Sequence, residues 1–92
     1  MVYQINMAVV LHWHAVEDEY VVFDETSGQT HQLDPIRAFI LNALQEKYLS
    51  TQAIFEELCL SLKPDDTSEL QALTQEILNE FVSHGLAEVQ SL

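Results

Sequence analysis

The fold is decided by residues 20–40, which read YVVFDETSGQTHQLDPIRAFI. The first four residues are aromatic or β-branched, as is typical of a strand. Residues 24–28 form a polar connection in which Gly28 can adopt the positive φ of a hairpin turn. A short strand, residues 29–33, follows this connection. Asp34 is then a capping residue and Pro35 suits the first helical position, so the pair predicts the start of a helix.

A further strand precedes this stretch. Side chains alternate with a period of two over residues 9–14, which indicates a strand. The acidic residues 17–19 provide a polar turn between this strand and residues 20–23. The region 9–34 is therefore expected to form a three-stranded antiparallel meander. Residues 1–7 either pair or fray, and the sequence leaves both outcomes open.

Helical periodicity replaces the strand pattern after Asp34. The first predicted helix ends near Lys47 and has one apolar face, formed by Ile36, Phe39, Ile40, Ala43 and Leu44. The second begins at Ser50 or Thr51 and breaks at residues 63–66. Its inward residues are Ile54 and Leu58, with Leu62 as a further candidate.

A third helix is expected after residue 66. Asp66 and Glu69 have the spacing of a capping box, and Gly85 suits the position just past the helix end. The apolar stripe of this helix contains Leu70, Leu73, Ile77, Leu78 and Phe81. Residues 86–89 could add a short terminal strand. Three strands followed by three helices predict a single α+β domain over residues 1–92, with a winged-helix-like arrangement.

Charge disfavours the DNA binding that this arrangement often serves. The chain has 15 Asp and Glu residues against three Lys and Arg residues, for a net charge of −12. Its last 29 residues, 64–92, contain neither Lys nor Arg. Neutralising phosphates requires a basic face, and attachment to anionic lipids has the same requirement. We therefore expect neither nucleic acid nor a membrane as partner.

Patterns that indicate catalysis are missing from the sequence. Cys59 lies between two leucines without an adjacent cation, which predicts a structural thiol rather than a reactive one. As the single cysteine it suits a reducing cytoplasm. Ser27 and Ser83 lack the glycine pattern of a nucleophile elbow, and no glycine-rich phosphate loop is present. We expect a protein that is not an enzyme and uses no cofactor.

Histidines form the candidate metal site. His12 and His14 lie two residues apart on a strand and share one face, whereas His31 lies two strands away. Strands one and three of a meander are about 9–10 Å apart. Strand histidines that are partly exposed are therefore the preferred interpretation, and we expect no metal.

The third predicted strand, residues 29–33, has one side without a pairing partner. Natural edge strands are commonly protected by charge, proline or a bulge, and this strand has none of them. Either its short length protects it, or the edge accepts a peptide strand through backbone hydrogen bonds.

Four segments carry a resemblance to a known family: Trp13, residues 17–24, the hairpin sequence SGQTHQLDP at 27–35, and GLAE at 85–88. They resemble the PqqD-like family, and more narrowly its HPr-rel-A system PqqD-family peptide chaperone branch. The likeness covers about residues 9–90, and the hairpin is its more specific part. It implies a winged-helix-like, non-catalytic domain that serves as a recognition element for ribosomally made precursor peptides.

The resemblance also implies a binding site. In such relatives the leader of the precursor peptide adds as a strand beside the third strand and packs against the third helix. The receiving edge would be Thr30, His31, Gln32 and Leu33, and the candidates for the groove wall are Leu70, Leu73, Ile77 and Phe81. Two of these four are expected to face the groove. The domain would hold the peptide near a modifying enzyme and raise its effective concentration.

Another function class uses the same surface. A structural or regulatory winged-helix-like protein could form a homodimer through the sheet edge or the apolar helix faces. The sequence leaves this alternative open. If the protein is a peptide-recognition element, its acidic charge favours a peptide or partner with basic residues near its docking segment.

Overall fold

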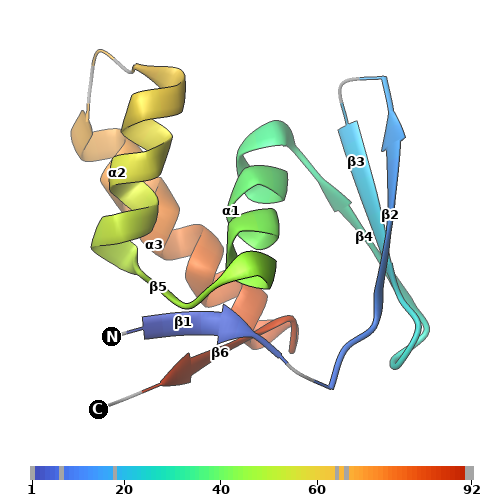
Figure 1. Cartoon of the computed structure of the whole chain (residues 1–92). Helices are drawn as coiled ribbons and strands as arrows, with labels where there is room; N and C mark the ends of the chain where they lie inside the picture. Colours follow the sequence, from blue (N-terminus) through green and yellow to red (C-terminus); the bar gives the residue numbers. More distant parts are fainter. Residues whose placement is uncertain (1, 7, 18, 64, 66, 91–92) are drawn as a thin grey trace.

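The computed structural model describes residues 2–6, 8–17, 19–63, 65 and 67–90. Its elements follow one another as β1 (Val2–Ile5), β2 (Leu11–Val16), β3 (Glu19–Asp24), β4 (Gln29–Leu33), α1 (Pro35–Glu46), β5 (Leu49–Ser50), α2 (Thr51–Leu62), α3 (Thr67–Ser83) and β6 (Ala87–Gln90) (Figure 1). The expected order of three meander strands and three helices is confirmed. The expected terminal strand is present as β6, and β1 and β5 are additional.

The meander is a three-stranded antiparallel sheet with the order β2-β3-β4. Trp13 lies opposite Val22, which in turn lies opposite His31. Strand β4 has the predicted bounds, whereas β2 begins at Leu11 rather than at Val9. The reason is a local turn, because the N–H of Val9 donates to the carbonyl of Asn6.

A buried carboxylate organises the hairpin between β3 and β4. Asp24 is only 4% exposed, and it accepts hydrogen bonds from the Thr26 N–H and the Ser27 hydroxyl, each at 2.9 Å. Burial alone would raise the pKa of Asp24, but these donors outweigh it and hold that pKa below its usual value. Gly28 completes the turn with a φ of 76°.

Helix ends follow the predicted signals. The side chain of Asp34 accepts from the Arg37 N–H at the start of α1, and Ser50 caps α2 in the same way. Gly85, with a φ of 76°, ends α3 in a Schellman motif, in which the Leu86 N–H donates to the Phe81 carbonyl. The predicted capping role of Asp66 lies outside the described residues.

A second small sheet settles the question of the N-terminal segment. Strand β1 pairs antiparallel with β5 on one side and with β6 on the other. Tyr3 therefore lies between Leu49 and Val89, two residues that are far from it in sequence. The Asn6 side chain strengthens the junction by donating to the Gly85 carbonyl at 2.9 Å.

Helix α1 lies between the meander and the other two helices, with the second sheet at one end of the group (Figure 1). The fully buried side chains of the core are Val22, Ile40, Leu41, Leu44, Ile54, Leu58, Thr74, Ile77, Leu78 and Leu86. The inward placement of Leu62 is wrong, because that side chain is 48% exposed at the last residue of α2. Among the described helices, none is both long and apolar enough to cross a membrane.

Candidate functional site

Strand β4 is an open edge of the meander. Within the described residues it pairs with β3 and with no other strand. Its residues have no proline or cationic side chain, and they continue directly into the cap of α1. The side of β4 away from β3 is therefore accessible for pairing.

The backbone direction along β4 follows from the register. The Glu25 N–H donates to the Val10 carbonyl, so that hydrogen-bonded pairs between β2 and β3 fall on every second residue from that point. Val22 lies between two such positions and directs its backbone groups toward His31 on β4. The backbone N–H and C=O of His31 therefore pair with Val22 inside the sheet.

Thr30 and Gln32 occupy the alternate positions on β4. Their N–H and C=O groups point away from β3 and toward the open side, because antiparallel pairing alternates along a strand. The exposed edge therefore presents two donors and two acceptors at a two-residue spacing. An added extended chain would pair with these four groups.

A groove of about 240 Å³ lies between β4 and the C-terminal part of α3. We call it the β4–α3 groove. Its lining residues are Thr30, His31, Gln32, Leu33, Arg37, Glu80, Phe81, His84 and Leu86. All four residues predicted for the receiving edge thus belong to one concave surface, together with one of the predicted wall residues.

The predicted wall residues occupy different environments. Phe81 lines the groove, although most of its ring is buried. Leu70 and Ile77 are buried in the core, and Leu73 is a partly buried residue that packs against it. Helical spacing identified the inward stripe of α3 correctly but did not separate its core residues from its groove residues.

An ion pair connects α1 to α3 at the groove. Arg37 donates to both carboxylate oxygens of Glu80, at 2.9 and 3.1 Å, and also to Asp34. The hydrogen bonds lower the pKa of Glu80 and raise that of Arg37. Two carboxylates share one guanidinium, so this end of the groove keeps a net negative charge. The sequence carries no local signal for a pair of residues 43 positions apart.

Two histidines form another part of the lining. The rings of His31 and His84 stack with their centroids 5.7 Å apart. Within the described residues, the buried Nε2 atom of His31 has no hydrogen-bond partner. Burial lowers the pKa of His31 and the charge of His84 lowers it further, against a smaller opposing effect of Asp24. The neutral form of His31 is therefore favoured in the folded protein.

Folding stability should consequently decrease when the pH falls from 7.5 to 5.5. In the unfolded chain His31 has a pKa of about 6.5 and takes up a proton in this range. In the folded chain its pKa is lower, so the unfolded state binds more protons and gains stability relative to the folded state. The loss begins near the unfolded pKa and is complete below the folded one. We expect His31→Gln to flatten the dependence of the melting temperature on pH, and His14→Gln, an exposed control, to retain it. An unchanged slope in His31→Gln would contradict this assignment, since Asp24 and Glu80 lose their contributions only at lower pH.

The other strand histidines lie on the opposite face of the sheet. His12 and His14 alternate with Trp13, which faces α1, and His12 contacts Glu25 at 2.8 Å. His31 faces the helices, so the three imidazoles do not converge. Within the described part of the chain, no group of three or more His, Cys, Asp and Glu side chains is arranged to hold a metal. Cys59 is a partly buried free thiol.

Comparison with known proteins supports the fold. No family model matches the chain, and no curated protein shows significant similarity to it. Among solved structures, it is similar to TbiB1 in complex with the TbiA(beta) leader peptide, with a TM-score of 0.74 and 22% sequence identity. The match covers 97% of this chain and 99% of that one. The two chains therefore share one fold over essentially their whole length.

Proposed function

We propose that this protein is a non-catalytic peptide-recognition domain of the PqqD-like class, which binds a precursor peptide and presents it to a modifying enzyme. The observation that carries the proposal is the open edge of β4, whose outward backbone groups at Thr30 and Gln32 border the β4–α3 groove. The peptide adds as a strand to this edge. Its side chains on the helix side enter the groove.

The fold comparison supports this role. TbiB1 has the same fold and was solved with a leader peptide. In the present chain, the β4–α3 groove adds the small exposed parts of Leu33 and Phe81 to the backbone groups of the edge. The domain works by tethering, which raises the concentration of the peptide near the enzyme without bond chemistry of its own. A cytoplasmic location is part of the proposal, and a single cysteine suits that reducing compartment.

Charge supports a peptide with basic residues near its docking segment. The cluster of Asp34, Arg37 and Glu80 at the groove contains two carboxylates and one guanidinium. The whole chain carries a net charge of −12. A peptide with Lys or Arg beside its docking segment therefore fits this surface, and its binding should weaken as salt increases.

Titration of the isotope-labelled chain with synthetic peptides tests the proposal. The probes are peptides that cover every short open reading frame flanking its gene. We expect one of them to shift the amide resonances of Thr30–Leu33 and of the end of α3, and to bind more tightly at low salt than at physiological salt. Peptide-independent shifts that grow with protein concentration would instead indicate a homodimer. That result, or the absence of any peptide-induced shift at β4, would overturn the proposal.

A further inference from the structure

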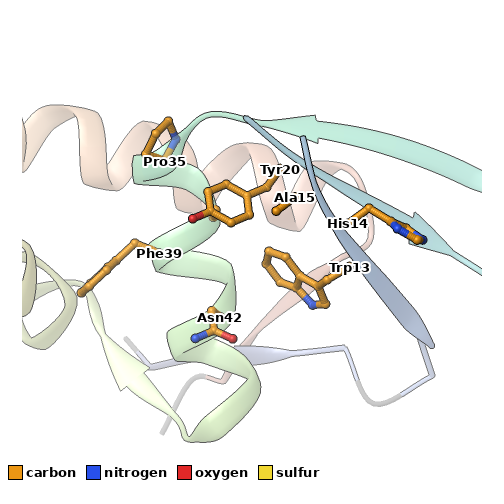
Figure 2. Close-up of a pocket in the computed structure, with 8 residues that line it drawn as sticks. Trp13, His14, Ala15, Tyr20, Pro35, Phe39 and Asn42 are labelled. Atoms are coloured by element: carbon orange, nitrogen blue, oxygen red, sulfur yellow. The ribbon is translucent and has the colours of Figure 1, made fainter. Parts of the chain in front are cut away.

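A second and larger cavity lies at the opposite edge of the meander, between β2 and α1. Its volume is about 560 Å³, within the range of about 300–1,000 Å³ that is typical of ligand pockets. We call it the aromatic pocket. Its lining residues are Trp13, His14, Ala15, Tyr20, Pro35, Ala38, Phe39 and Asn42. Figure 2 shows Trp13 and Tyr20 directed from the sheet toward α1, with the His14 ring pointing away.

The pocket borders the second open edge of the meander. Within the described residues, β2 pairs with β3 alone. Because Val10 and Glu25 form a hydrogen-bonded pair, His12 and His14 also direct their backbone groups to β3. The alternate residues of β2 therefore direct theirs outward, away from the sheet.

Trp13 and Ala15 are two of these outward-directed residues, and both also line the pocket. Unpaired backbone groups and an apolar cavity thus occur at the same two positions. A small molecule would use the cavity but leave the backbone groups unpaired. An extended polypeptide would use both, since strand addition pairs the backbone and places alternate side chains on the pocket side.

The pocket walls are suited to a large apolar side chain. Trp13 donates its indole N–H to Gln45 at 2.9 Å, so its polar atom is already satisfied and the ring offers its apolar surface. Tyr20 is 37% exposed and Phe39 is partly buried, which leaves aromatic surface uncovered on both sides of the cavity.

Charges near β2 indicate the rest of the partner's chemistry. Glu17 follows the strand directly, and Glu25 lies beside its beginning, against His12. Two of the basic side chains, Arg37 and Lys47, are engaged with carboxylates elsewhere. A docking segment with Lys or Arg therefore complements this edge. A second copy of a chain with a net charge of −12 does not.

We propose that the β2 edge and the aromatic pocket form a second docking site, for an extended segment of a partner protein. The segment adds a strand beside β2, places a large apolar side chain in the pocket and carries Lys or Arg next to it. This site lies at the opposite edge of the sheet from β4. One molecule would therefore hold two polypeptides at once, and the proposal does not depend on what binds β4.

The probe is a phage-displayed library of random peptides, selected on the full chain carrying Gln32→Pro and then measured on Ala15→Pro. Each proline removes one outward N–H, so each variant serves as the matched control for the other edge. We expect the selected peptides to contain a large apolar residue near Lys or Arg and to shift the amide resonances of Leu11–Ala15. Ala15→Pro should weaken their binding about tenfold or more, for one lost hydrogen bond, whereas the unmodified chain should bind them as tightly as Gln32→Pro does.

Tyr20→Ala provides a variant with an intact backbone, and it should also weaken binding, because it removes one pocket wall. Peptides that bind Ala15→Pro as tightly as the unmodified chain, or whose shifts lie in the β4–α3 groove, would overturn the proposal. Self-association shifts at Leu11–Ala15 without peptide would overturn it as well.

Discussion

Replacing Gln32 by proline is expected to lower the affinity for a precursor peptide by about 30- to 100-fold. The substitution removes the outward N–H of Gln32 and places a ring where the added strand would lie. Loss of one or two backbone hydrogen bonds at a desolvated edge corresponds to about 2–3 kcal/mol. The measurement is a binding isotherm with the peptide identified by the titration described above.

The same substitution should leave the domain folded. The Gln32 N–H has no partner in the β3–β4 ladder, because the register directs it to the open side. Proline is tolerated at edge positions of this kind. The Gln32 side chain also donates to Glu19, so Gln32→Ala is the control that loses this bond but keeps the N–H. Equal affinities for the proline and alanine variants would show that the peptide does not add as a strand at β4.

A proline at the neighbouring position, His31, is expected to unfold the sheet. His31 directs its backbone groups to Val22 inside the sheet. His31→Pro would therefore break the ladder and unfold the meander, and its loss of binding would carry no information about the edge. Alternation along β4 makes Gln32 the informative site and His31 an uninformative one.

The centre of the fold could be predicted because its signals are local. The turn at Gly28, the cap at Asp34 and the end of α3 at Gly85 each depend on a few adjacent residues. Their conformations follow from steric preference and capping hydrogen bonds, which a short stretch of sequence determines. The bounds of β4 and the start of α1 were therefore predicted correctly.

The second sheet could not be predicted in the same way. Its pairing joins Tyr3 to Leu49 and to Val89, and β5 consists of only two residues. A two-residue strand shows no periodicity, and pairing between distant segments depends on the packed core rather than on local preference. The ion pair of Arg37 with Glu80 was missed for the same physical reason.

Strand β2 was predicted from the sequence only in part. Its period-two pattern was detected, but the pattern did not reveal that a turn at Val9 would delay the start of the strand. Nor did it reveal that Trp13 and Ala15 would meet α1 across a cavity. Alternation indicates which residues share a face of the sheet, whereas the depth of packing against a helix is a property of the tertiary structure.

Ile77→Ala is expected to cause the largest loss of stability among the variants that should remain folded. Ile77 is fully buried, and its truncation removes apolar contacts and leaves a cavity, at a cost of about 2–5 kcal/mol. Chemical denaturation should show this as a lower midpoint with an unchanged slope. A domain of this size has a total stability of about 5–15 kcal/mol, so a folded population should remain for binding experiments.

The affinity of that folded population distinguishes core residues from groove residues. Ile77 does not line the β4–α3 groove, so Ile77→Ala should change peptide affinity by less than about threefold once the unfolded fraction is accounted for. Phe81 is buried to a similar degree but does line the groove, so the milder Phe81→Leu should lower affinity more than Ile77→Ala while costing less stability. If Ile77→Ala reduced affinity as strongly as Phe81→Leu, the peptide would have to reach between α3 and the core. Burial would then no longer separate the two classes of residue on this helix, and the wall implied by the resemblance would be the better description.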